Sequence, residues 1–222
     1  MLETYPSTEA MAQAAAHAVE AGLIEGLRTR GRASLVATGG RSPGPVFDAL
    51  NDPAVDWARV VVTLSDERCV EPDAVESNAR LVRERLLAGR RARAHLLPLW
   101  PAPPAAALTA LAPFDAVMLG MGEDGHVASL IPGDPGLEQA MDPSSDRWLV
   151  PVPAGIGKPP VARVSLTLAA LLEARAIFLL IAGEAKREVI IRAQAGADLP
   201  VRALLTQDRV PVRIFWSPSH EG

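Results

Sequence analysis

Residues 33–50 read ASLVATGGRSPGPVFDAL. The short apolar run over 33–38 closes on Gly39 and Gly40, which predicts a buried strand followed by a tight turn. Ser42 and Pro43 then stand in the order that is typical of the cap and the first residue of a helix. The stretch therefore predicts a strand, a glycine turn and a helix that continues to residue 50.

The same alternation of apolar strands and helices continues along the rest of the chain. Strands are predicted over residues 59–64, 95–99, 114–120, 176–182 and 210–216, and helices over residues 8–29, 77–88 and 184–195. Residues 132–145 are rich in Pro and Gly and predict a long irregular crossing. Because strands that are apolar on both sides belong to parallel sheets covered on both faces, we expect an α/β fold with a mainly parallel, Rossmann-like sheet. No linker divides the chain, so we expect a single domain over residues 1–222.

The composition excludes several classes of protein. The 222 residues carry 22 Lys and Arg against 26 Asp and Glu, a net charge of −4 that argues against a nucleic-acid binder. A single cysteine, Cys69, cannot form an internal disulfide, and the apolar stretches are much shorter than the roughly 20 residues that cross a membrane. The first residues lack the pattern of a signal peptide. We therefore expect a cytoplasmic protein that acts on a small molecule, as a monomer or a small homo-oligomer.

Four loops follow predicted strands and so belong to the sheet edge where ligands bind in such folds. They cover residues 39–42, 65–69, 120–126 and 183–186. In the first, two glycines and Ser42 precede a helix start, where free backbone N–H groups suit a phosphate, although a plain tight turn has the same pattern. In the last, Lys186 stands in the first turn of a helix, against the helix dipole, which favours an anionic partner.

Residues 120–126, GMGEDGH, match the spacing of a dinucleotide-binding loop, but we reject that interpretation. Pro132 and Pro135 leave no room for the helix that such a loop requires, and Glu123 and Asp124 would repel a pyrophosphate. His126 beside Asp124 at a strand end instead predicts an acid–base pair, because histidine exchanges protons near neutral pH. No His and Cys spacing indicates a metal site, and no GxSxG motif surrounds Ser129.

Four segments together resemble the 6-phosphogluconolactonase family, which is related to glucosamine-6-phosphate deaminase. They are FDAVMLGMGEDGHVASLIPG, VATGGRSPGPVFDAL, LSDERCVEPDAVESNARLVRERLL and PPVARVSLTLAALLEARAIFLLIAGEAKREVI, and they extend from about residue 35 to residue 191. The resemblance implies hydrolysis of 6-phosphogluconolactone in the pentose phosphate pathway, by a hydrolase of carbohydrate metabolism. Because a δ-lactone hydrolyses unaided, we expect no metal and no cofactor.

The resemblance also implies roles for individual residues. His126 matches the general base, and Asp124 matches an acid of the pocket. The expected substrate-binding and phosphate-binding residues are Gly39, Gly40, Ser42, Asp66, Arg68, Asn78, Arg163 and Lys186.

Two other functions fit parts of the same pattern. The related deaminase uses a glutamate five residues after the histidine, where this chain has Ile131, and an isoleucine cannot relay a proton. A sugar-phosphate sensor without catalytic activity usually carries a DNA-binding segment, for which this chain has no spare residues. Both observations favour the lactonase.

Overall fold

Within residues 2–218, the part of the chain that the computed structural model describes, seven parallel strands form the central sheet. Their order is β1-β10-β9-β6-β2-β3-β5. The strands are β1 (Leu2–Thr4), β2 (Ala33–Ala37), β3 (Val60–Leu64), β5 (His95–Leu96), β6 (Ala116–Gly120), β9 (Ile177–Ala182) and β10 (Val212–Ser217). Every residue of β2 and β9 is buried, as expected of strands covered on both faces, and the prediction of a mainly parallel α/β sheet is confirmed.

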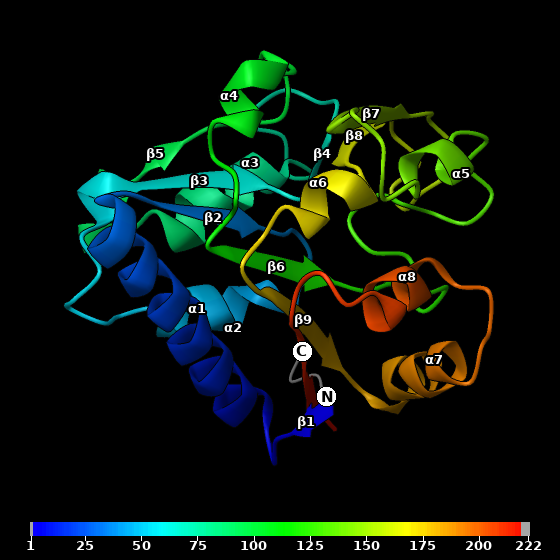
Figure 1. Ribbon diagram of the computed structural model, residues 1–222, viewed down its shortest axis with the longest axis horizontal. Coiled ribbons are helices and arrows are strands. Elements are labelled where there is room, and N and C mark those ends of the chain that lie inside the picture. Colours follow the sequence, from blue (N-terminus) through cyan, green and yellow to red (C-terminus); the bar gives the residue numbers. More distant parts are fainter. Residues whose placement is uncertain (1, 219–222) are drawn as a thin grey trace.

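Helices cover both faces of this sheet. They are α1 (Thr8–Arg30), α2 (Pro43–Ala49), α3 (Asn78–Leu81), α4 (Ala105–Thr109), α5 (Leu137–Ala140), α6 (Leu168–Leu172), α7 (Glu184–Gln194) and α8 (Pro200–Thr206). In Figure 1, α1 and α2 lie below strands β2 and β3, whereas α4 and α6 lie above the sheet. A π-helical turn (Val82–Leu86) extends α3, and short 3-10 segments cover Trp57–Arg59 and Gly89–Arg93.

The ends of α1 follow directly from the sequence. The Ser7 side chain accepts a hydrogen bond from the backbone N–H of Ala10, and Gly31 ends the helix in a left-handed conformation with φ of 71°. Small residues such as Ala12 and Ala15 are buried along α1, which packs across β2, β6, β9 and β10. Close packing of this helix therefore fixes the central strands, and with them the loops that follow.

A second, antiparallel sheet of three strands was not predicted. It consists of β4 (Asp66–Arg68), β8 (Arg163–Leu166) and β7 (Leu149–Val152), in the order β4-β8-β7. The expectation of a loop over residues 65–69 is thus wrong in part, because the charged triplet 66–68 pairs with β8. No local pattern could show this pairing, since its partner lies about a hundred residues later in the chain. The small sheet stands at the carboxyl end of β3, where the backbone N–H of Leu166 donates to the Ser65 carbonyl at 2.9 Å.

Two local predictions need correction. Ser42 precedes α2 as expected, but its backbone is already helical and its side chain makes no capping hydrogen bond. In the strand expected over residues 95–99, only His95 and Leu96 pair with β3. Neither change moves the glycine turn away from the sheet edge.

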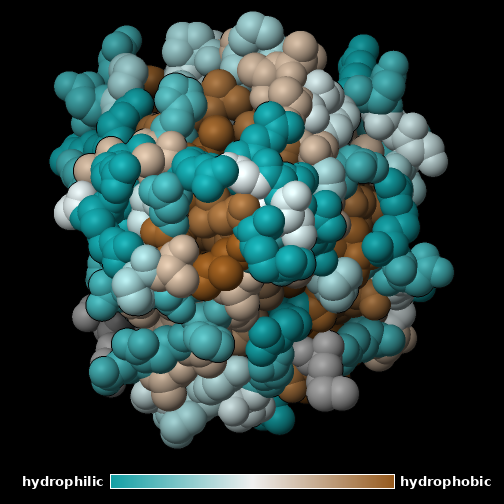
Figure 2. Space-filling model, turned by 60° about the vertical axis from the view of Figure 1, so that its left-hand side comes forward, coloured by the Kyte–Doolittle hydropathy of each residue, from teal (hydrophilic) through white to brown (hydrophobic). Residues whose placement is uncertain are grey.

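The surface is mostly polar. Figure 2 shows apolar residues exposed in separate patches with hydrophilic side chains around them. Among the described residues, the large apolar side chains that are exposed are Val75, Trp100 and Ile191. None of the helices within residues 2–218 combines the length and apolar content that crossing a membrane requires.

Candidate functional site

A cleft of about 160 Å³ opens at the carboxyl ends of β2, β3 and β6. The structure brings nine of the ten expected site residues into its lining, which includes Gly39, Gly40, Ser42, Asp66, Arg68, Asn78, His126, Arg163 and Lys186. The tenth, Asp124, is hydrogen-bonded to His126. Residues spread over most of the chain therefore meet at one edge of the sheet.

His126 and Asp124 form a close pair in the loop after β6. The Nδ1 atom of His126 lies 2.6 Å from Oδ1 of Asp124, and the backbone N–H of His126 donates to the same oxygen at 3.2 Å. The hydrogen bond from the imidazole lowers the pKa of Asp124, more than partial burial raises it. An ionised Asp124 accepts the Nδ1–H proton, which leaves the Nε2 lone pair as the basic site.

The loop that carries this pair requires glycine at two positions. At Gly122, a Cβ atom would collide with the His126 ring and the Asp124 carboxylate. Gly125 has φ of 78°, and its carbonyl accepts from the backbone N–H of Val201 at the start of α8. The glycines of GMGEDGH thus let the chain fold back on itself and present His126 to the cleft, and no dinucleotide-binding helix follows.

The glycine turn after β2 is built around Asn78. A Cβ at Gly39 would collide with the Asn78 amide, and Gly40 adopts φ of 93° with open space around it. The Asn78 side chain donates to the Asp66 carbonyl at 2.8 Å and accepts from Nη1 of Arg68 at 2.7 Å. Asn78 therefore joins the glycine turn to the charged strand β4.

Glu67 is buried and organises the start of α3, a role that the sequence did not reveal. Its carboxylate accepts from the backbone N–H groups of Arg68, Asn78 and Ala79 at 2.6–2.7 Å and from the Ser77 hydroxyl at 3.1 Å. Four donors satisfy a buried charge that would otherwise be costly. Glu67 thereby fixes Arg68 and Asn78, which face the cleft.

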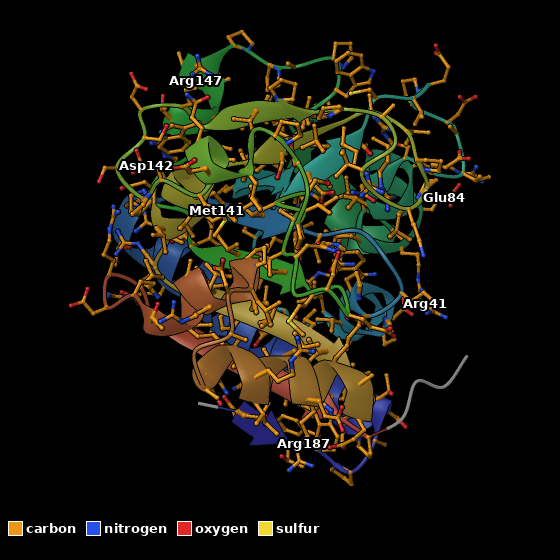
Figure 3. The ribbon with its side chains drawn as sticks, turned by 90° about the vertical axis from the view of Figure 1, so that its right-hand side faces the viewer. Arg41, Glu84, Met141, Asp142, Arg147 and Arg187 are labelled. Atoms are coloured by element: carbon orange, nitrogen blue, oxygen red, sulfur yellow. The ribbon has the colours of Figure 1, made fainter. Side chains whose placement is uncertain are left out.

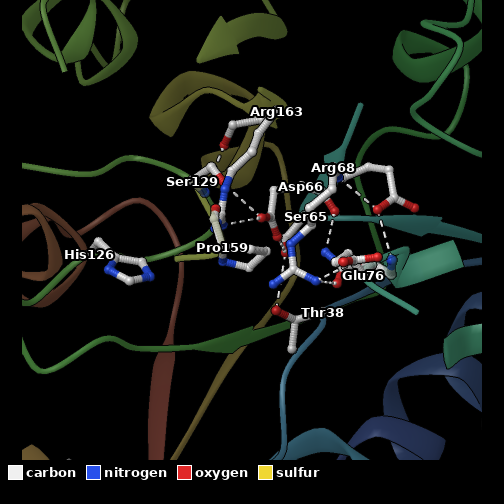
Figure 4. A network of polar contacts seen from close by, with 12 residues as sticks. Thr38, Ser65, Asp66, Arg68, Glu76, His126, Ser129, Pro159 and Arg163 are labelled. Atoms are coloured by element: carbon white, nitrogen blue, oxygen red, sulfur yellow. Dashed lines mark hydrogen bonds and ion pairs between the residues drawn. The ribbon is translucent and has the colours of Figure 1, made fainter. Parts of the chain in front are cut away.

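Asp66 is buried, like its neighbours Ser65 and Glu67, and it contacts hydroxyl groups. Its carboxylate accepts from the Ser129 hydroxyl at 2.6 Å and the Ser65 hydroxyl at 3.0 Å, and its Oδ2 atom lies 4.0 Å from Nη1 of Arg163 (Figure 4). Arg68 points its Nη1 atom to the carbonyl of Glu76 and to Asn78, not to this carboxylate. Asp66 is therefore placed to orient Arg163 and Ser129 and does not hold Arg68.

Lys186 approaches the cleft from the first turn of α7, as expected. Burial lowers the pKa of its ammonium group, and the nearby positive charge of Arg41 lowers it further, against the attraction of Glu123. Because burial disfavours the charged form of Lys186, an anion bound beside it would stabilise that form.

The structure adds lining residues that the sequence analysis missed. Arg41 follows the glycine turn and is exposed at the rim, and Figure 3 shows it at the edge of the molecule. Lys158 lines the cleft from the loop between β7 and β8. The lining then holds one carboxylate, Asp66, against five basic side chains: Arg41, Arg68, Lys158, Arg163 and Lys186. In a chain of net charge −4, this concentration of positive charge suits the binding of an anion.

Comparison with known proteins shows the family to which the chain belongs. The model of the family described as glucosamine-6-phosphate isomerases/6-phosphogluconolactonase matches residues 6–216. The chain belongs to this family. It is 40% identical over 225 residues to a 6-phosphogluconolactonase of Caulobacter vibrioides, and 38% identical over 231 residues to one of Rhizobium meliloti. The first alignment covers 97% of this chain and 97% of the Caulobacter protein, and the second covers 98% of this chain and 98% of the Rhizobium protein.

A crystal structure of a 6-phosphogluconolactonase from Shewanella baltica is similar with a TM-score of 0.89 at 36% identity, covering 98% of this chain and 97% of that one. The resemblance to the 6-phosphogluconolactonase family that four sequence segments indicated is therefore confirmed. The members of this family named here match 97–98% of the chain, so the similarity extends over the segments that line the cleft.

Proposed function

We propose that this protein hydrolyses 6-phospho-D-glucono-1,5-lactone to 6-phosphogluconate, with His126 activating the attacking water. The observation that carries the proposal is the meeting of a His126–Asp124 pair with five basic side chains in one cleft. The substrate combines an ester carbonyl with a distant phosphate dianion. The pair offers a base for the first group, and the basic side chains offer positive charge for the second. The identity to lactonases over nearly the whole chain supports the same assignment.

His126 would act through its Nε2 atom. It takes a proton from a water molecule as the oxygen adds to the lactone carbonyl, and returns that proton to the ring oxygen when the C–O bond breaks. General acid–base catalysis of this kind contributes roughly 10²–10⁴-fold. Asp124 would hold the imidazole by its Nδ1–H and stabilise the imidazolium ion that forms, as the acid of a catalytic triad does. A δ-lactone is reactive enough that the proposal invokes no metal and no covalent intermediate.

The phosphate would be anchored away from His126. Backbone N–H groups at Gly40 and the Ser42 hydroxyl supply neutral donors at the start of α2, while Arg163 and Lys186 supply charge. Arg68, or the backbone N–H groups of residues 120–125, would stabilise the oxyanion that develops at the carbonyl. Anchoring one end of the substrate converts its binding energy into orientation of the other end.

The alternatives have weaker support. Ile131 is buried where the related deaminase is expected to have its catalytic glutamate, so amine loss would lack a proton relay. A sensor without activity would not need the Asp124–His126 pair beside the anion-binding cleft.

We also propose that residues 1–222 act as one domain in the cytoplasm. Residues of both sheets, such as Val117 and Val164, belong to one hydrophobic core, which supports the single domain. The single cysteine is consistent with a reducing compartment.

The test is an assay of freshly generated 6-phosphogluconolactone coupled to a dehydrogenase, with glucosamine 6-phosphate as the counter-substrate. Lactone hydrolysis well above the spontaneous rate, with no amine release, is the expected result. Release of ammonia from glucosamine 6-phosphate without lactone hydrolysis would replace the proposal with the deaminase.

A further inference from the structure

Ser129 occupies the centre of a buried polar network behind the cleft, and its hydroxyl is not accessible from solvent. Its Oγ atom donates to Oδ2 of Asp66 at 2.6 Å and accepts from Nη1 of Arg163 at 3.4 Å. The carboxylate itself is 4.0 Å from Arg163. The hydroxyl therefore lies between two charges that do not bond closely to each other, as Figure 4 shows.

Only a group that both donates and accepts can fill this position. An ionised carboxylate accepts only, and a guanidinium donates only, whereas a hydroxyl has one proton to give and lone pairs to receive. Ser129 uses its proton on Asp66 and so turns a lone pair towards Arg163. The 2.6 Å hydrogen bond from Ser129 to Asp66 fixes the orientation of the hydroxyl group, and with it the direction from which Arg163 can donate.

The Arg163 side chain is only 4% exposed, and it is held on several sides. Its Nη2 atom donates to the carbonyl of Pro159 at 3.1 Å, and the guanidinium packs against Gly157, where a Cβ would come within 2.7 Å. Burial and the nearby charge of Arg68 lower the pKa of Arg163, and Asp66 opposes them. The Nε atom of Arg163 is buried and has no hydrogen-bond partner. The guanidinium group as a whole lines the cleft, so its positive charge lies where an anion would bind.

Ser129 is also connected to the loop that carries His126. Ala128, between them, has φ of 51°, the one positive value of a non-glycine residue within residues 2–218. The backbone N–H of Ser129 donates to the Ser165 hydroxyl on β8, the strand of Arg163. The segment 126–129 thus connects the residue that carries the imidazole to the residue that contacts Arg163.

We propose that Ser129 is a positioning residue, whose hydroxyl, together with Asp66, holds the guanidinium of Arg163 in the cleft lining, where its charge attracts the phosphate of the substrate. The proposal rests on the function proposed above for the choice of substrate. Ser129 takes no part in bond making. It sets where the anion binds relative to His126.

The test compares Ser129→Ala with Ser34→Ala, a matched control. Ser34 is a buried serine in β2 whose hydroxyl bonds to the Leu111 carbonyl outside the cleft. We expect Ser129→Ala to raise KM for the phosphorylated lactone about tenfold, the loss of one charged hydrogen bond, with kcat reduced less than about threefold. Ser34→Ala should leave KM unchanged. A pure loss of kcat, or an unchanged KM, in Ser129→Ala would overturn the proposal.

A second measurement separates positioning from a general loss of structure. In an Arg163→Lys background, Ser129→Ala should raise KM by less than twofold, because the lysine lacks the guanidinium that Ser129 orients. An undiminished tenfold effect in that background would show that Ser129 acts through another group. If Ser129→Ala does not fold, two other variants serve the same purpose. Ser129→Thr keeps the hydroxyl group, whereas Ser129→Cys loses its strong hydrogen bond. Of these two, only Ser129→Cys should raise KM.

Binding of inorganic phosphate, measured by calorimetry, tests the inference apart from turnover. Ser129→Ala should weaken phosphate binding about tenfold, whether or not the chain hydrolyses the lactone. If the unaltered protein binds phosphate but does not hydrolyse the lactone, the proposed function fails and this inference stands. If it hydrolyses the lactone and phosphate binding is the same in both proteins, the inference fails alone. If phosphate does not bind to the unaltered protein, this inference is overturned whatever the activity.

Discussion

Oδ1 of Asp124 lies 2.6 Å from Nδ1 of His126 and also accepts from the backbone N–H of His126 at 3.2 Å. One carboxylate oxygen therefore fixes both the ring and the main chain of the same residue. The side chain of His126 remains 29% exposed, so its other ring nitrogen can reach a water molecule in the cleft. The pair has the geometry of a base held by an acid, and its two members can be tested separately.

Replacing His126 by alanine removes the proposed base. We expect His126→Ala to lower kcat by roughly 10²–10⁴-fold, while KM for the lactone changes little, because the anion-binding residues remain in place. Stopped assays corrected for spontaneous hydrolysis would measure both constants. An enzyme that keeps its kcat without the imidazole would show that the base is another group.

Asp124→Asn keeps a similar shape but removes the charge that stabilises an imidazolium ion. We expect kcat to fall by about 10- to 100-fold, which corresponds to about 1.4–2.7 kcal/mol in the transition state. The pKa of Asp124 is lowered by its bond to His126, so the carboxylate stays ionised at mildly acidic pH. Its contribution to stability is present above the ordinary carboxyl pKa and is lost only as the pH falls through the lowered value. A kcat of Asp124→Asn equal to that of the unaltered enzyme at neutral pH would contradict the assigned role.

Gly122→Ala tests whether the close contact of the Gly122 backbone with the side chains of Asp124 and His126 is needed for activity. An added Cβ would collide with the His126 ring and the Asp124 carboxylate, so the pair should separate and kcat should fall at least about tenfold. Gly136→Ala is the matched control, because its Cβ would meet only Asp134 at an ordinary 3.5 Å and its φ is −88°. Kinetics of the two variants at equal folded concentration would settle the point, and equal losses would indicate a general effect of alanine in this region.

Much of the site could be predicted from the sequence because its loops follow apolar strands. Gly39, His126 and Lys186 each stand within a few residues of a strand end, and the carboxyl ends of parallel strands meet at one edge. The long helix α1 was predictable for a similar reason, since its cap at Ser7 and its stop at Gly31 are local signals. Local signals thus located the loops at this sheet edge, whereas Asp66, Arg68, Asn78 and Arg163 were expected only from the family resemblance.

The rest of the site depends on contacts between distant segments. Asp66 and Ser129 are 63 residues apart, and Arg163 lies 34 residues beyond Ser129, so no spacing rule connects them. A charged triplet at residues 66–68 normally indicates a surface, yet Asp66 and Glu67 are buried, and they pair with β8 in the small sheet. Lys158 reaches the cleft through a loop between two strands that the sequence did not predict.

Lys186 should confer a pH dependence on anion binding. Its pKa is lowered, mainly by burial, so it loses its proton below the ordinary lysine value of about 10.4. A bound anion favours the protonated form, and affinity should therefore fall as the pH rises through the lowered pKa. Calorimetric binding of 6-phosphogluconate from neutral to alkaline pH would reveal this loss, which Lys186→Arg should shift to higher pH. An identical pH profile in the two proteins would exclude Lys186 as the titrating group.

The burial of Lys186 also predicts a trade-off between the stability of the fold and the binding of an anion. The charged form of Lys186 is disfavoured in the folded protein, so its unfavourable contribution to stability is largest below the lowered pKa and fades above it. Lys186→Met removes the charge and keeps the volume, and should raise Tm at neutral pH while weakening phosphate binding. Thermal unfolding with and without phosphate measures both effects, because phosphate should raise the Tm of the unaltered protein more than that of the variant. A variant that is less stable and binds phosphate as before would contradict this account of Lys186.

Glu67→Gln tests the hydrogen bonds by which the Glu67 carboxylate holds the backbone next to the cleft. The carboxylate accepts four hydrogen bonds, and a glutamine would present an N–H₂ group to donors that need an acceptor. Loss of buried, charge-assisted bonds should cost about 3 kcal/mol, or a fall in Tm of roughly 6–12 °C for a chain of this size. Glu71→Gln, at an exposed position beyond the cleft lining, is the control and should leave Tm nearly unchanged. Because Glu67 holds the backbone of Arg68 and Asn78, Glu67→Gln should also raise KM at temperatures where the variant remains folded. A lower Tm with an unaltered KM would show that Glu67 contributes to stability alone.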